Sequence, residues 1–109
     1  MIVKRPSIFI YANNPDKGML KEICAGIEEE GVFFEIFEKD SDSLDGLAFD
    51  AANDSMLGSG IGIKGNSAVL QMKGVKKGKN VASVNFPNDE DCRIIGANSA
   101  RIIKKMPLK

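Results

Sequence analysis

The distribution of hydrophobic and polar residues along the chain predicts five strands and three helices. Short apolar runs rich in β-branched and aromatic residues predict strands at 7–12, 32–38 and 81–86. The segment 60–72 predicts two more strands, joined by a tight turn at Gly65 and Asn66. Apolar residues at helical spacing predict helices at 15–30, 43–53 and 87–106.

The order of these elements, β-α-β-α-β-β-β-α, predicts the architecture. A strand, a crossover helix and a second strand form a parallel unit, whereas the tight turn makes the strand at 68–72 antiparallel to its neighbours. We therefore expect a single three-layer α/β/α domain over residues 1–109. Its five-stranded mixed sheet should have one antiparallel strand and helices on both faces, an arrangement similar to the anticodon-binding fold.

The first predicted helix has recognisable ends. Asn14, Pro15 and Asp16 offer, in turn, a capping residue, a proline suited to a first turn and an acid favoured at the positive end of the helix dipole. Gly31 suits the left-handed conformation that often follows a helix. These signals predict a helix that begins near Pro15 and ends near Glu30.

Three consecutive glutamates occupy the last turn of this helix, against the helix dipole. The dipole disfavours each of Glu28, Glu29 and Glu30 by roughly 0.3 to 1 kcal/mol at an exposed position. At about 100° per residue, Glu28 and Glu30 flank the apolar stripe, while Glu29 points away from it. The triplet is either a solvated helix end without a task, or it presents the Glu29 carboxylate to a cation on another subunit.

Composition and charge narrow the class of function. Histidine is absent, which argues against triad hydrolysis and histidine-based metal catalysis. The net charge is zero, but residues 1–55 carry five Lys or Arg against twelve Asp or Glu, and residues 56–109 carry ten against three. The opposite charges either interleave in the fold or form separate faces that orient a charged partner. The sequence shows no set of residues typical of a catalytic site, so it favours an interaction module over an enzyme.

Local motifs have simpler explanations than binding sites. Gly60, Gly62 and Gly65 fit the dinucleotide pattern G-x-G-x-x-G, but a strand follows instead of a helix, which favours close packing of a helix on a strand. The lysines at 73, 76, 77 and 79 lack interleaved aromatic residues, which is typical of a solvated loop. Cys24 and Cys92 have no metal-site or disulfide spacing and are expected to be packed thiols.

The N-terminus and the hydropathy of the chain bear on the location of the protein. The sequence has no signal-type N-terminus and no long apolar run, which predicts a cytoplasmic protein without a membrane span.

In the closing helix, Gly96 and Ala100 lie four residues apart, which favours close helix packing. Asn98 and Arg101 are candidates for a partner interface, or alternatively cap and pair locally within the domain.

Beyond these patterns, the chain resembles the small subunits of diol and glycerol dehydratase reactivating factors, which are related to the dehydratase medium subunit. The resemblance spans nearly the whole chain and lies in three segments: GIEEEGVFF at 26–34, GSGIGIKGNSAVLQMKG at 58–74 and, most specifically, RIIGANSARIIKKMP at 93–107. It implies a chaperone-like, non-catalytic subunit that works with a large Hsp70-like ATPase. The complex would contain two large and two small subunits. The client would be an adenosylcobalamin-dependent dehydratase, in the cytoplasm or in a bacterial microcompartment.

The resemblance also implies a role for the glutamate triplet. Glu29 is expected to reach across the subunit interface and help ligate a divalent cation such as Mg²⁺, held mainly by carboxylates of the large subunit. No nucleotide or cobalamin is expected to bind this chain alone.

Two other classes of function remain open from the residues. One is a medium-subunit-like component of a dehydratase itself, which would lie against bound cobalamin; the short chain argues against it. The other is a small nucleic-acid-binding module, suggested by the predicted fold; zero net charge and a single tyrosine argue against it.

Overall fold

The computed structural model describes residues 5–109, so residues 1–4 of the predicted domain lie outside the described residues. The strands are β1 (Ile8–Asn13), β2 (Phe34–Glu38), β3 (Ser59–Lys64), β4 (Ser67–Met72) and β5 (Ala82–Asn85), and the helices are α1 (Lys17–Glu29), α2 (Leu44–Asp54) and α3 (Asp89–Lys104). The sheet order is β2-β1-β3-β4-β5. β1 is parallel to β2 and β3, and β4 is antiparallel to β3 and β5. The predicted mixed sheet with one antiparallel strand is confirmed.

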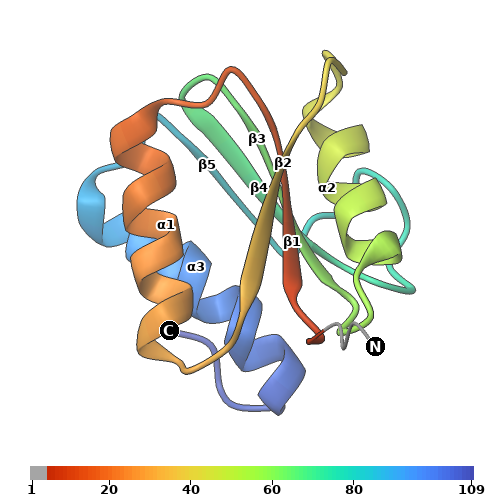
Figure 1. Ribbon diagram of the computed structural model, residues 1–109, viewed down its shortest axis with the longest axis vertical. Helices are drawn as coiled ribbons and strands as arrows, with labels where there is room; N and C mark the ends of the chain where they lie inside the picture. The colour runs from red at the N-terminus through yellow and green to blue at the C-terminus, as the bar shows by residue number, and fades with distance from the viewer. Residues whose placement is uncertain (1–4) are drawn as a thin grey trace.

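The helices cover both faces of the sheet, which confirms the three predicted layers (Figure 1). α1 and α3 pack together on one face, and α2 lies against β1, β3 and β4 on the other. The larger core lies beneath α1 and α3 and includes the fully buried Ile10, Ile61 and Leu70. A smaller core beneath α2 contains Tyr11 and Leu47.

The ends of α1 differ from the sequence prediction for local reasons. Asp16, and not Asn14, is the capping residue, because its carboxylate accepts a 2.9 Å hydrogen bond from a backbone N–H of the first turn. Asn14 has a left-handed φ of 48° and belongs to the preceding turn. At the other end the helix stops at Glu29, Glu30 is the cap, and Gly31 adopts the predicted left-handed conformation with a φ of 74°.

Left-handed residues also shorten the last predicted elements. Phe86, with a φ of 49°, ends β5 one residue early. Asn88 then caps α3 by accepting a 2.7 Å hydrogen bond from the backbone N–H of Asp91. Lys105, with a φ of 57°, ends the same helix at Lys104.

Glycines in β3 allow α2 to lie directly on the sheet. A Cβ atom at Gly60 would overlap the backbone of α2, and one at Gly62 would lie 2.5 Å from the backbone nitrogen of Ala48. The segment that follows is the two-residue turn Gly65–Asn66 and then β4, so no helix N-terminus is present to hold a phosphate. The packing interpretation of this glycine motif is confirmed.

α1 and α3 approach each other just as closely. A Cβ atom at Gly96 would overlap the carbonyl oxygen of Ile23, and one at Gly26 would overlap the carbonyl oxygen of Arg93. The two glycines thus bring the backbones of α1 and α3 into contact, which confirms close helix packing at Gly96. This contact fixes how the ends of the two helices are aligned.

Side chains of opposite charge interleave across the two halves of the sequence. Each of the four ion pairs in the described residues joins an acid from 1–55 to a base from 56–109: Asp42 with Lys64, Glu22 with Arg93, and Glu30 with both Arg101 and Lys104. Interleaving, rather than two separate charged faces, therefore accounts for part of the uneven charge distribution. The lysines of residues 73–79 lie in the exposed loop between β4 and β5, as predicted.

The two cysteines are packed thiols, as predicted. Both are buried and free of disulfides. Burial raises the pKa of the Cys24 thiol to about 11 and also raises the pKa of Cys92, so both thiols stay protonated and poorly nucleophilic at neutral pH.

Within residues 5–109, none of the helices is both long and apolar enough to cross a membrane.

Candidate functional site

The carboxyl ends of α1 and α3 meet at one edge of the molecule, and the C-terminus of the chain lies beside them (Figure 1). The two helices run in the same direction, because Glu22 pairs with Arg93 near their first halves and Glu30 pairs with Lys104 at their ends. Carbonyl groups at helix ends carry partial negative charge. The three glutamates therefore lie where the backbone is already electronegative.

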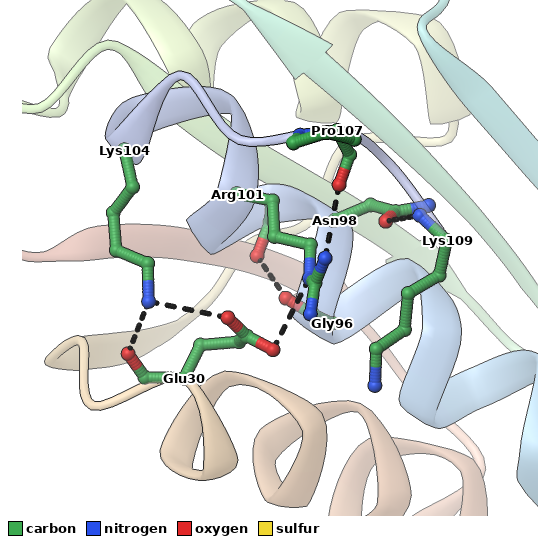
Figure 2. A network of polar contacts seen from close by, with 8 residues as sticks. Glu30, Gly96, Asn98, Arg101, Lys104, Pro107 and Lys109 are labelled. Atoms are coloured by element: carbon green, nitrogen blue, oxygen red, sulfur yellow. Dashed lines mark hydrogen bonds and ion pairs between the residues drawn. The ribbon is translucent and has the colours of Figure 1, made fainter.

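Glu30 is turned inward and neutralised by α3 (Figure 2). Its side chain is only 9% exposed, and its two carboxylate oxygens contact Nε of Arg101 at 3.2 Å and Nζ of Lys104 at 3.1 Å. Nζ of Lys104 also donates a 2.9 Å hydrogen bond to the backbone carbonyl of Glu30. Two bases from α3 thus offset the cost of placing Glu30 at the negative end of α1.

The pairing of Glu30 predicts a pH-dependent contribution to stability. The hydrogen bond from Lys104, together with Arg101, lowers the pKa of the Glu30 carboxyl group below its usual value. A lowered folded-state pKa stabilises the fold above the unfolded-state pKa of about 4.3 and loses this effect as pH falls through the folded-state value. Glu30→Gln should therefore reduce the free energy of unfolding near pH 7 and have little effect near pH 2. Urea denaturation at both pH values measures the difference; an equal loss at both would contradict the ion-pair explanation.

Arg101 and Asn98, the two predicted interface residues, hold the last residues of the chain (Figure 2). Nη1 of Arg101 donates a 3.0 Å hydrogen bond to the carbonyl of Pro107, and Oδ1 of Asn98 accepts one of 2.8 Å from the backbone N–H of Lys109. Asn98 is only 6% exposed. Both residues therefore make the local contacts that were the alternative to a partner interface, and their contact with a partner stays a prediction.

Glu28 and Glu29 differ from Glu30 because both are exposed. Among the described residues neither forms an ion pair, and Arg93 of α3 is paired with Glu22 instead, at 2.6 Å. Glu29 thus presents a carboxylate to solvent at the negative end of α1, as its place opposite the apolar stripe predicts. Its role as a cation ligand stays a prediction.

A divalent cation at this edge would need ligands from elsewhere. Carboxylate oxygens such as those of Glu29 are the ligands that Mg²⁺ prefers. Among residues 5–109, however, no three His, Cys, Asp or Glu side chains come together as a metal site would require. The exposed carboxylates fit the role of one ligand in a site that a second protein completes.

An apolar hollow adjoins the same end of α1, where the chain turns into β2. It measures about 300 Å³ and is lined by Glu28, Gly31, Val32, Phe33 and Phe34. Phe33 is 54% exposed. The predicted strand at 32–38 begins two residues later, at Phe34, because residues 32 and 33 belong to the connection between α1 and β2 that lines this hollow. The sequence patterns indicated neither the hollow nor the inward role of Glu30. The three-residue spacing of Arg101 and Lys104 places them on one helix face, but only tertiary packing shows which acid they meet.

Comparisons with known proteins identify the family of this chain. The family model described as "Dehydratase medium subunit" matches residues 5–109. The small subunit of the propanediol dehydratase-reactivating factor from Citrobacter freundii is 31% identical over 105 residues, which cover 95% of this chain and 90% of that protein. The corresponding protein from Salmonella typhimurium is 29% identical over the same coverage.

Two solved structures share the fold closely. A chain of the diol dehydratase-reactivating factor, complexed with ADP and Mg²⁺, superposes with a TM-score of 0.91 at 26% identity and covers 97% of this chain and 99% of its own length. A chain of a glycerol dehydratase reactivase gives a TM-score of 0.91 at 25% identity and covers 96% and 97%. The chain therefore belongs to the dehydratase medium subunit family and, within it, to the small subunits of dehydratase-reactivating factors.

Proposed function

We propose that this chain is the small subunit of an ATP-dependent, chaperone-like factor that reactivates an adenosylcobalamin-dependent diol or glycerol dehydratase. The large partner subunit binds and hydrolyses the nucleotide. The small subunit leaves that partner, and the exposed surface of the large subunit then engages the dehydratase medium subunit, whose fold the small subunit shares. The resulting steric conflict loosens the enzyme and releases the damaged cobalamin.

The observation that carries this proposal beyond family membership is the exposed carboxylate of Glu29, which has no ion-pair partner among residues 5–109. Its neighbour Glu30 is neutralised by Arg101 and Lys104, which leaves the negative charge at the end of α1 facing outward. A divalent cation, bound mainly by the large subunit near its nucleotide, would bridge the two subunits through Glu29. The related factor solved with ADP and Mg²⁺ supports a nucleotide and a magnesium ion in such a complex.

Such a bridge suits a subunit that must leave its partner. A cation held by ligands from both subunits gives strong, directional binding, and the binding weakens when the ligands or the charge of the nucleotide change. ATP binding or hydrolysis next to the cation could thus shift the small subunit between its bound and released states. In the released state, the large subunit would be free to engage the dehydratase.

The function is tested by measuring the release of damaged cobalamin. Inactivated dehydratase is incubated with the large subunit and Mg-ATP, with or without this chain, and the cobalamin that passes a protein-retaining filter is measured by absorbance. We expect release to be fastest with both subunits and nucleotide, for a diol dehydratase, a glycerol dehydratase or both. Equal release without this chain, or no release with both subunits, would contradict the proposal.

A second function, a structural component of a dehydratase itself, is favoured by one observation, the medium-subunit description of the matching family model. In that case the chain would stay with the large cobalamin-binding subunit of the enzyme throughout purification. Affinity capture of this chain from its source cell distinguishes the two, because a reactivating subunit should bring down the ATPase-like partner instead.

A further inference from the structure

The apolar hollow at the start of β2 faces solvent although its aromatic residues are held in place by other parts of the fold. The backbone N–H of Ile8 donates a 2.9 Å hydrogen bond to the carbonyl of Phe33, which ties this residue to the start of β1. The guanidinium group of Arg5 lies 4.8 Å from the centre of the Phe33 ring. Phe34 packs against the larger core, whereas Phe33 belongs to neither core and is 54% exposed.

The lining of the hollow suits a protein side chain better than a small molecule. Small-molecule pockets combine apolar walls with several placed polar groups and usually measure from about 300 to 1,000 Å³. This hollow lies at the lower limit, and among its lining residues Glu28 alone has a polar side chain. A small ligand would find little to orient it, whereas an apolar side chain already positioned by its own subunit needs only shape and apolar surface.

The charge around the hollow restricts the partner further. Glu28 lines the hollow, Glu29 follows it, and both are exposed at the negative end of α1. Arg5 lies on the Phe33 side of the hollow, so the acidic charge is confined to the side formed by α1. On that side an acidic surface would be repelled, whereas a surface that carries positive charge, such as a bound divalent cation, would be attracted. Because Glu28 lines the hollow and Glu29 is the next residue, the hollow adjoins the contact proposed for Glu29.

We propose that this hollow is a socket for a large apolar side chain of the large reactivase subunit, seated next to the cation that Glu29 helps to ligate. This inference rests on the proposed function and adds a second, metal-independent anchor to the same interface. Aromatic anchors in a desolvated pocket often dominate the energy of a protein interface. The cation then sets orientation and nucleotide dependence, and the socket supplies affinity that remains when the cation is removed.

The test measures the affinity of Phe33→Ala for the purified large subunit by titration calorimetry, in magnesium and in chelator. We expect binding on the order of 30-fold weaker than wild type in both solutions, the loss typical of an interface hot spot. Phe86→Ala is the matched control, because Phe86 is also highly exposed, at 76%, but follows β5 at the opposite edge of the sheet. Circular dichroism checks that both variants fold.

Each other outcome has a distinct meaning. Wild-type affinity of Phe33→Ala would reject the socket and leave the proposed function standing, whereas failure of the wild-type chain to bind the large subunit in either solution would reject the proposed function. An equal loss in Phe86→Ala would show a general effect of exposed apolar surface and also reject the socket. If Phe33→Ala instead converts a dimer of this chain to a monomer and keeps its affinity for the large subunit, the hollow is a self-association surface.

Discussion

Glu29→Gln is expected to fold like the wild type and to bind the large subunit roughly 100-fold more weakly in magnesium. The fold should persist because Glu29 is exposed and forms no ion pair within the described part of the chain, and because removing a negative charge slightly relieves the conflict with the α1 dipole. Binding should weaken because a neutral amide oxygen is a much poorer ligand for Mg²⁺ than a carboxylate. In chelator the variant and the wild type should bind equally, since neither then has a cation to ligate.

Glu28→Gln is the charge-matched comparison for this experiment, and because Glu28 lines the apolar hollow and is not the proposed cation ligand, any effect it has should be the same in magnesium and in chelator. Glu28 is exposed on the same turn, so its substitution makes the same change in net charge and in helix dipole energy. Glu30→Gln has the same composition change but is unsuitable, because it breaks the ion pairs with Arg101 and Lys104. A loss of affinity shared equally by Glu28→Gln and Glu29→Gln would mean diffuse electrostatic attraction. Unchanged affinity in Glu29→Gln would mean that this carboxylate binds no shared cation.

Gly96→Ala is expected to destabilise the fold by about 2 kcal/mol, even though alanine is the better helix former. A Cβ atom at this position would overlap the carbonyl oxygen of Ile23 and lie 3.0 Å from its carbon, and both are backbone atoms that cannot rotate away. α1 and α3 would have to separate, which would also disturb the contacts between Glu30 and Lys104 at their ends. Thermal denaturation should show a midpoint lower by roughly 10 °C for a domain of this size.

Gly18→Ala is the matched control for the packing argument. Gly18 is also a helical glycine, in the first turn of α1, but it is exposed, and a Cβ atom there would meet nothing closer than an oxygen of Asp16 at 3.4 Å. Alanine should therefore stabilise the protein by roughly 0.5 to 1 kcal/mol through its lower conformational freedom in the unfolded chain. Stabilisation by both substitutions would contradict the close contact of α1 with α3.

The sequence by itself determined the order and type of every element in the described residues, because each was encoded by a strong local pattern. The apolar stripe of α1, the short apolar runs of the strands and the turn at Gly65 and Asn66 act over a few residues, so they can be detected without knowledge of the fold. The outward position of Glu29 also followed from helical periodicity alone. Errors were confined to element ends, where a single residue such as Asp16 or Phe86 decides capping or strand termination.

Only the tertiary structure decided which side chains meet across the sequence. The inward turn of Glu30 depends on Arg101 and Lys104, more than 70 positions away, and they reach it because Gly26 and Gly96 bring α1 and α3 into register. The same packing separated three glutamates that look equivalent in sequence into one neutralised residue and two exposed ones. Helical periodicity gives the direction of a side chain, whereas a long-range partner depends on how whole helices pack, and no local pattern encodes that.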